Sequence, residues 1–158
     1  MKKAVIFDID GVLAEKSPER DYREYDKVDL DIPIKKVFEL LKFYIAQTIP
    51  QYGNSQPFID KIIFITGRKQ YSRDLTLKWL DNELQKSFYS LYLNSDFPNV
   101  WEIFMRADDD HRKAAVLKKE IYETHIKGKY DVVACFDDDP EICEMYKNEG
   151  LLVFEVKR

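Results

Sequence analysis

The chain has 158 residues, of which 45% are hydrophobic and 14% aromatic, and it contains only 5 glycines and 6 prolines. These values exclude a disordered or low-complexity chain and predict one domain over residues 1–158 with a single buried core. A net charge of −4 excludes a general electrostatic attraction to nucleic acid or membranes, so such binding would need a local basic patch.

Two apolar runs in the first half of the chain predict buried strands. Residues 4–7 are continuously apolar and lead into Asp8, a pattern typical of a strand covered on both faces of a parallel sheet. The run is too short for a signal peptide or a membrane-spanning helix, so we expect a cytoplasmic protein that does not contact a membrane. Residues 61–65 repeat the pattern, and we expect this strand to stop at Thr66-Gly67-Arg68.

Helices are predicted between and after these strands. Residues 34–48 place their apolar side chains on one helical stripe, and Pro33 suits the start of that helix. Residues 53–57 predict a loop. After the Thr66-Gly67-Arg68 turn we expect a second helix that directs three leucines towards the core: Leu77, Leu80 and Leu84.

The next part of the chain alternates between the same two patterns. Residues 88–93 and 100–105 could each form a short strand, and the sequence leaves their order open. Residues 110–126 predict a helix, and residues 132–136 predict another buried strand.

The last predicted helix, residues 140–148, carries clear end signals. Asp139 is placed to cap its start, and Gly150 follows its end. Residues 151–156 then form a final strand. Strands that alternate with helices indicate an α/β fold with a mostly parallel sheet, whose functional site lies at the carboxyl ends of the strands.

Polar residues follow three of the predicted strands, and they are expected to meet at one edge of the sheet. Carboxylates this close cannot all stay ionised without a cation, and their oxygens suit Mg²⁺, which also bridges to phosphate. The candidate metal ligands are Asp8, Asp10, Asp137 and Asp138, and the polar residues after the remaining strand are Thr66 and Arg68.

The first two of these carboxylates are spaced for two-step phosphoryl transfer. A carboxylate nucleophile such as Asp8 forms an acyl phosphate that water later hydrolyses. Asp10 can protonate the leaving oxygen and then activate that water. Each motif alone also has an ordinary explanation, because Asp10-Gly11 is a common turn and Thr66-Gly67-Arg68 is a common link from strand to helix.

Three cationic residues stand out in the predicted helix over residues 110–126. Lys118 borders the apolar stripe next to Ala114, which is unusual for a solvated lysine. Arg112 and Lys113 lie in the first turn, where positive charge opposes the helix dipole, so a nearby anion would explain both.

These residues resemble the four motifs of the haloacid dehalogenase (HAD) superfamily, in the same order: Asp8-x-Asp10-Gly11-Val12, Thr66-Gly67-Arg68, Lys118 and Asp137-Asp138. The resemblance implies a HAD-like Rossmannoid domain of three layers and Mg²⁺-dependent chemistry. Because phosphatases of the superfamily carry the second aspartate of the first motif, Asp10 implies hydrolysis of a phosphate ester through a phospho-aspartate on Asp8.

A further stretch contains Ile103-Phe104-Met105-Arg106, Asp110-His111-Arg112-Lys113, Val116-Leu117-Lys118, Tyr122 and His125. This stretch is similar to the 3′-phosphatase domain of bacteriophage polynucleotide kinase-phosphatase, a family that heals nucleic-acid ends. By this resemblance Lys118 holds Asp8 and the phosphoryl group, Arg68 binds phosphate, and Arg20 or Arg23 reaches the substrate. That substrate would be a DNA or RNA end with a 3′-terminal phosphate.

The chain departs from that family at two positions. Ala114 stands where the phage enzymes commonly have an aspartate that supports the site, and Thr66 replaces a serine but keeps the hydroxyl. The sequence also has no Gly-rich phosphate loop followed by Lys-Ser/Thr, so kinase activity is not expected, and a separate kinase or ligase would act alongside.

The spacing between motifs bears on the substrate. Both long segments, from Asp10 to Thr66 and from Arg68 to Lys118, are too short for a large cap domain, and an open site admits a polynucleotide end. A local basic rim would offset the acidic total. Its candidates are Arg20, Arg23, Arg68, Lys69, Arg73, Arg106, Arg112 and Lys113.

Two other functions stay open. One is a phosphatase of the same superfamily that hydrolyses a nucleotide or sugar phosphate. The other is a non-catalytic phosphate-sensing module, comparable to a response-regulator receiver domain. Receiver domains place the acceptor aspartate on a middle strand. In this chain the predicted strand over residues 62–65 ends in Thr66 instead, which weighs against a receiver domain.

Overall fold

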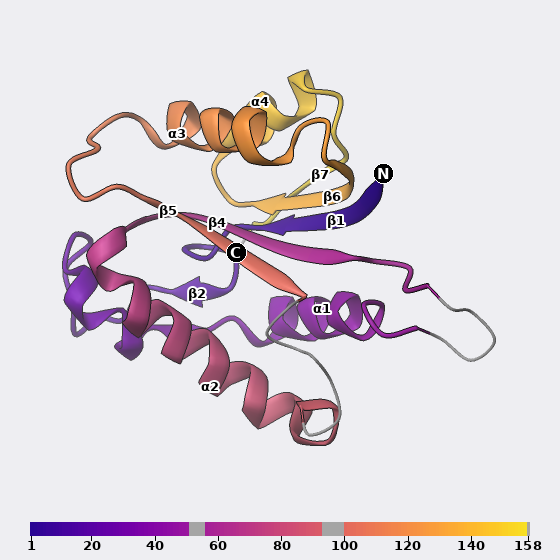
Figure 1. Cartoon of the computed structure of the whole chain (residues 1–158). Helices are drawn as coiled ribbons and strands as arrows, with labels where there is room; N and C mark the ends of the chain where they lie inside the picture. The colour runs from indigo at the N-terminus through magenta and orange to yellow at the C-terminus, as the bar shows by residue number, and fades with distance from the viewer. Residues whose placement is uncertain (51–55, 93–99, 158) are drawn as a thin grey trace.

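The computed structural model describes residues 1–50, 56–92 and 100–157, and its centre is a parallel sheet (Figure 1). The strand order is β5-β4-β1-β6-β7, so β1 pairs with β4 on one side and with β6 on the other. The strands are β1 (Lys2–Phe7), β4 (Lys61–Lys69), β5 (Trp101–Arg106), β6 (Tyr130–Asp137) and β7 (Val153–Glu155).

Helices cover both faces of this sheet, which confirms the predicted three-layer α/β fold (Figure 1). One face carries α1 (Lys35–Ala46) and α2 (Arg73–Tyr92). The other carries α3 (Ala114–Ile121), its π-helical continuation η4 (Tyr122–Ile126), and α4 (Pro140–Asn148).

The side chains of β1 alternate between two buried clusters, one under each helical layer. Val5 and Phe7 join the cluster that includes Leu41 of α1, whereas Ala4 and Ile6 join the other cluster. A strand buried on both faces needs continuous apolar sequence, which explains why residues 4–7 could be predicted.

The segment between β1 and α1 adds only small elements. These are the antiparallel pair β2 (Ala14–Glu15) and β3 (Ile32–Pro33) and the 3-10 helix η1 (Tyr25–Leu30), while η2 (Gln70–Ser72) precedes α2. Within the described ranges neither long segment forms a cap domain, as predicted. None of the helices described has the length and apolar character that crossing a bilayer requires.

The strand over residues 61–65 is confirmed, but the expectation that it stops at Thr66-Gly67-Arg68 is wrong. β4 continues to Lys69, which is paired with Arg106 of β5 after a shift of register beyond Thr66. Pairing with the neighbouring strand therefore carries β4 past a tripeptide that looks like a turn.

The two ambiguous runs resolve differently. Residues 100–105 match β5, whereas residues 88–92 continue helix α2 instead of forming a strand. Residue 93 and residues 53–55 of the expected loop lie outside the described residues.

The remaining helices agree with the predictions except at two starts. Pro33 belongs to β3, so α1 begins at Lys35. The helix predicted from residue 110 begins only at Ala114, because the Asp110 carboxylate accepts a hydrogen bond from the Arg112 backbone N–H (2.8 Å) and holds a loop. For α4, the predicted cap is confirmed, since Asp139 accepts from the Glu141 N–H (2.8 Å).

Candidate active site

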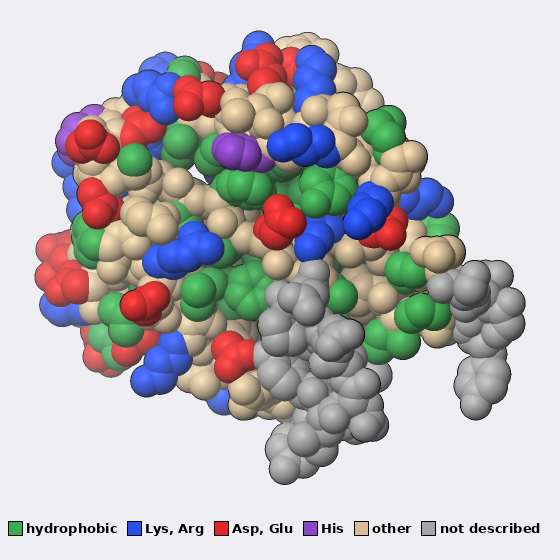
Figure 2. All heavy atoms as spheres, viewed as in Figure 1, with side chains coloured by type: hydrophobic (Ala, Val, Ile, Leu, Met, Phe, Trp, Pro, Cys, Tyr) green, Lys and Arg blue, Asp and Glu red, His purple; other side chains and the backbone are tan. Residues whose placement is uncertain are grey.

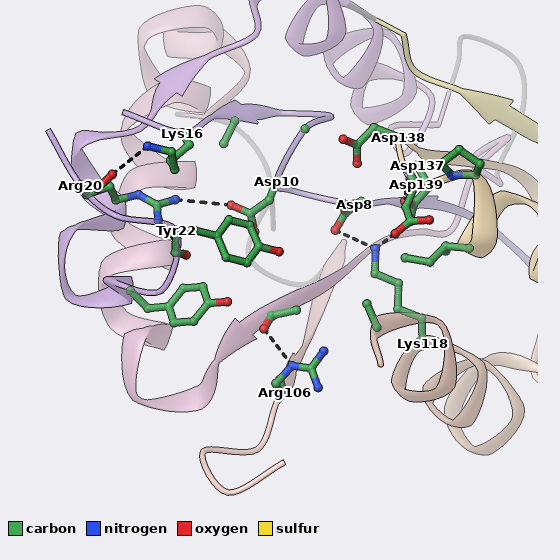
Figure 3. Close-up of a pocket in the computed structure, with 17 residues that line it drawn as sticks. Asp8, Asp10, Lys16, Arg20, Tyr22, Arg106, Lys118, Asp137, Asp138 and Asp139 are labelled. Carbon is green, nitrogen blue, oxygen red and sulfur yellow. Dashed lines mark hydrogen bonds and ion pairs between the residues drawn. The ribbon is translucent and has the colours of Figure 1, made fainter. Parts of the chain in front are cut away.

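A cavity of about 530 Å³ opens at the carboxyl ends of β1, β4, β5 and β6 (Figure 3). The sheet order brings these strand ends together from distant parts of the sequence. The residues labelled around the cavity are Asp8, Asp10, Lys16, Arg20, Tyr22, Arg106, Lys118, Asp137, Asp138 and Asp139.

Asp8 follows the central strand and faces a buried lysine. Its backbone N–H donates to the carbonyl oxygen of Phe136 (2.9 Å), which continues the pairing of β1 with β6. Lys118 of α3 places its Nζ 2.9 Å from Asp8 Oδ1 and 2.7 Å from Asp137 Oδ2. One ammonium therefore lies between two carboxylates (Figure 3).

Burial makes this group electrostatically sensitive. It raises the pKa of Asp8 well above its usual range, an effect that Lys118 opposes and the neighbouring Asp137 and Asp10 reinforce. For Lys118, burial alone would lower the pKa, but the Asp8 and Asp137 carboxylates outweigh burial and raise it. Lys118 therefore stays a cation, and further positive charge near Asp8 would favour its ionised form.

Three carboxylates form a group that suits a hard cation. Asp8, Asp137 and Asp138 each offer a ligand oxygen, and these oxygens lie within 4.8 Å of one another. Oxygen ligands of this kind, with room for water in the open cavity, fit Mg²⁺. The Asp10 carboxylate, also a predicted ligand, lies outside this group and turns towards Arg68 instead.

A glycine makes room for this group. Gly11 has a φ of +87°, and a Cβ built on it would lie 1.9 Å from Oδ2 of Asp138. The Asp138 carboxylate therefore occupies the space that any other residue at position 11 would fill.

Asp10 lies on the side of Asp8 away from Lys118, and hydrogen bonds from Arg68 and Thr66 hold its carboxylate (Figure 3). Arg68 Nε lies 3.0 Å from each Asp10 carboxylate oxygen and Arg68 Nη2 lies 2.8 Å from Oδ1, while Thr66 Oγ1 donates to Oδ2 (3.1 Å). The Asp10 side chain nevertheless remains 36% exposed towards the cavity. It can therefore meet a substrate without losing its orientation.

A buried aspartate that the sequence analysis missed supports this arrangement. The fully buried Asp31 carboxylate binds Arg68 Nη2 (2.8 Å) and both Nε and Nη2 of Arg20 (2.6 Å each). Arg20 Nη2 in turn lies 3.8 Å from Asp10 Oδ1. No sequence pattern marks Asp31, because it lies between two apolar residues, Leu30 and Ile32, that would be expected in the core but are more than 40% exposed.

Two predicted substrate-binding arginines occupy different positions. Arg20 lines the cavity. Arg68 is fully buried behind Asp10, and its donors engage Asp10, Asp31 and Thr76 Oγ1 (3.4 Å). This geometry favours Arg68 as a residue that positions Asp10, and contact with phosphate stays a prediction.

The other three predicted substrate-binding residues do not line this cavity. Arg23 is exposed, Arg112 pairs with Asp110 and Glu120, and Lys113 lies 3.8 Å from Glu141. Asp110 in the loop before α3 and Glu120 within α3 are therefore the acidic partners of Arg112, and Glu141 lies near Lys113. A further anion is not needed to explain these two cations.

Other residues line the cavity without having been singled out as substrate-binding. Arg106, which was named only in the basic rim, donates to the carbonyl oxygens of Gly67 (3.2 Å) and Arg112 (2.6 Å). Lys16 and Tyr22 come from the loop after β2, and Tyr25 begins η1; no spacing rule marks these residues in the sequence. Ala114 lines the cavity near Lys118, which has Asp137 as its support.

Comparison with known proteins places this site in a family. Residues 2–158 match the family model of the polynucleotide kinase PNKP phosphatase domain. A protein of Autographa californica nuclear polyhedrosis virus, assigned as a bifunctional polynucleotide kinase/RNA ligase, is 29% identical over 157 residues. The match covers 99% of this chain but only 20% of that viral protein.

Solved structures give the same result. A chain of the Pnkp1/Rnl/Hen1 complex has a TM-score of 0.75 and 27% identity, over 99% of this chain and 46% of that one. A chain of the Pnkp1/Rnl/Hen1 RNA repair complex has a TM-score of 0.74 and 28% identity, over 98% of this chain and 42% of that one. The chain therefore belongs to the family of polynucleotide kinase PNKP phosphatase domains, which makes it a phosphatase, a hydrolase of phosphoric monoesters.

Proposed function

We propose that this phosphatase removes the 3′-terminal phosphate from DNA or RNA ends, with Mg²⁺ and through a phospho-aspartate on Asp8. The observation that carries the proposal is the position of Asp8. It lies in an open cavity between the ammonium of Lys118 and a group of carboxylates suited to a divalent cation.

In the first step a carboxylate oxygen of Asp8 attacks phosphorus, and the bond from phosphorus to the 3′ oxygen breaks. Asp10 gives its proton to the leaving 3′ oxygen, and Lys118 lies close enough to Asp8 to stabilise charge on the transferring group. The products are a 3′-hydroxyl end and an acyl phosphate on Asp8.

In the second step water attacks the phosphorus of the acyl phosphate. The Asp10 carboxylate takes the proton of that water, the bond between phosphorus and Asp8 breaks, and inorganic phosphate leaves. The contacts of Arg68 and Thr66 hold Asp10 in one orientation for both proton transfers.

Mg²⁺ would be held by Asp8, Asp137 and Asp138 and would supply positive charge for an anionic nucleophile and an anionic substrate. The same charge would oppose the burial, and the weaker repulsion from Asp137 and Asp10, that raise the pKa of the Asp8 carboxyl.

The choice of a polynucleotide end rests on the family and on the shape of the site. The family model is that of a polynucleotide kinase phosphatase domain, and the short elements between β1 and α1 leave the cavity open to a long substrate. The viral relative is assigned as a polynucleotide kinase and RNA ligase, and one of the solved structures is an RNA repair complex. We therefore further propose that a kinase or ligase activity works alongside this phosphatase.

Phosphate release from four oligonucleotides, DNA and RNA with a 3′- or a 5′-phosphate, tests this proposal, with a mononucleotide as the small-substrate comparison. We expect Mg²⁺-dependent release from 3′ ends, loss of activity with a chelator and recovery with added Mg²⁺. Clearly higher catalytic efficiency on the mononucleotide would contradict the substrate assignment.

The Asp8→Asn variant tests the covalent mechanism. It keeps the shape of the side chain but removes the nucleophile, so we expect no detectable release and no labelled protein after acid quenching with ³²P substrate. Unchanged activity in this variant would contradict the phospho-aspartate.

A further inference from the structure

Two aromatic rings on the cavity wall have no part in the chemistry described above. Tyr22 and Tyr25 line the cavity together with Asp10 and Arg20. In Figure 3 the Tyr22 ring lies on the same side as Arg20 and Asp10, opposite Lys118. Tyr22 is 72% exposed, and in the described ranges no other ring packs against it, so the ring remains accessible to a ligand.

The position of Tyr22 is tied to the reacting carboxylates. Arg20 Nη1 donates to the carbonyl oxygens of Asp21 (3.2 Å) and Tyr22 (3.5 Å). The same guanidinium binds the buried Asp31 and lies 3.8 Å from Asp10. The backbone at Tyr22 is therefore anchored beside Asp10, and a ligand that stacks on the Tyr22 ring lies near that carboxylate.

Tyr25 gives this wall a second, better supported ring. Its ring is half-buried and packs edge-on against Tyr71, at 6.3 Å between centroids and 68° between planes. The Tyr71 backbone N–H is in turn held by the Asp108 carboxylate (2.8 Å). Of the two rings, Tyr25 is therefore packed against the rest of the protein, whereas Tyr22 is exposed at the cavity.

Charge alone is a weak source of affinity for a polyanion in this protein. The net charge is −4, and five of the residues that line the cavity are aspartates. On the face drawn in Figure 2, acidic and basic side chains are interspersed without a continuous basic patch. Stacking of a base on an aromatic ring adds affinity without charge and works for every base.

We propose that Tyr22, with Tyr25 beside it, stacks on the base of the nucleotide that carries the 3′-phosphate. This inference rests on the proposed function and names the part of the substrate that the site recognises.

Steady-state kinetics of the wild type, Tyr22→Ala and Tyr22→Phe test the proposal on two 3′-phosphorylated single-stranded oligonucleotides. One has an ordinary terminal nucleotide, and the other has an abasic terminal nucleotide. For the ordinary end we expect Tyr22→Ala to raise KM about tenfold with little change in kcat, and Tyr22→Phe to match the wild type. For the abasic end we expect the same KM in all three proteins.

The matched control is Phe43→Ala on α1, an aromatic residue that is 59% exposed and does not line the cavity, and its KM should be unchanged. An unchanged KM of Tyr22→Ala on the ordinary end, or an equal rise on the abasic end, would overturn the stacking site alone. Failure of the wild type to release phosphate from either oligonucleotide would instead overturn the proposed function.

Discussion

At Asp31 a single carboxylate, without exposure to solvent, faces the guanidinium groups of Arg20 and Arg68. Such a group stabilises the native state only while its charges remain matched, because an unpaired buried charge has lost its hydration without a partner. The two arginines also contact Asp10, so the charge balance at Asp31 reaches the proposed proton donor.

Replacing Asp31 by asparagine keeps the shape but leaves two buried arginines underneutralised. We expect the free energy of unfolding to fall by about 3 kcal/mol, measured by urea denaturation. We also expect kcat to fall about tenfold or more, since a positioned acid and base contribute roughly 10²–10⁴ to the rate.

The control for this variant is Asp29→Asn, which changes an exposed aspartate in η1, two residues before Asp31. Both its stability and its kcat should match the wild type. A stable and fully active Asp31→Asn protein would show that Asp10 does not depend on this network.

The residues of the site were predictable where chemistry and strand ends coincide. Asp8, Asp137 and Asp138 directly follow or end apolar strands, and the structure brings them together. Asp31 was not predictable, because a prediction from residue type would bury the apolar residues on either side of it and expose the aspartate. The structure does the opposite: Leu30 and Ile32 are exposed and Asp31 is buried. Arg112 was predicted to bind an anion because it was placed in the first turn of a helix, where positive charge opposes the dipole. The helix begins only at Ala114, and the pairing of Arg112 with Asp110 depends on a loop that periodicity cannot reveal.

At the scale of elements, the turn after β1 combines backbone strain with a ligand position. The Ile9 carbonyl oxygen accepts from the N–H groups of Leu13 (2.9 Å) and Ala14 (2.8 Å), which closes a tight turn around Gly11. Because of the positive φ and the nearby Asp138 carboxylate, this turn depends on glycine for two separate reasons.

Gly11→Ala separates these two reasons when it is compared with Gly128→Ala. Gly128 has a φ of +77° with nothing within 4 Å of a built Cβ, so only strain applies there, at about 1–2 kcal/mol of stability. We expect Gly11→Ala to lose at least as much stability and also to require more Mg²⁺ for half-maximal activity. An unchanged Mg²⁺ dependence would separate Asp138 from the metal.

Element boundaries were predicted best where the sequence alone determines them. Continuous burial marks β1 and β6, and side-chain capping by Asp139 marks the start of α4. The end of β4 depends on pairing with β5, which the sequence of β4 alone does not reveal. Residues 88–92 are rich in β-forming residue types but belong to helix α2, so their strand propensity misled the prediction.

At the scale of the whole molecule, both cysteines report on unfolding. Cys135 and Cys143 are free thiols that lie in the core and are at most 1% exposed. Burial raises the pKa of Cys143 to about 11, and it raises the pKa of Cys135 further. In an unfolded chain a thiol has a pKa of roughly 8.5. The native protein therefore keeps both thiols protonated at pH values where the thiols of an unfolded chain begin to lose their protons.

We expect slow reaction of both thiols with a disulfide reagent at about pH 8 in the native state, and complete reaction within the mixing time in urea. The thiol pKa is higher in the folded protein than in the unfolded chain, so folding favours the protonated thiol. We therefore expect the contribution of the two thiols to the free energy of unfolding to be present at neutral pH and to decline between about pH 9 and 11. Rapid labelling of native protein would contradict the burial of these residues.

The central position of β1 also determines when the site can form during synthesis. The partners of β1 are β4 and β6, and β6 ends at Asp137. A ribosome must therefore release most of the chain before the nucleophile strand gains its second neighbour and Asp8 meets Lys118 and Asp137. Until then the growing chain exposes an apolar strand that depends on long-range pairing, and no partial product contains a complete site.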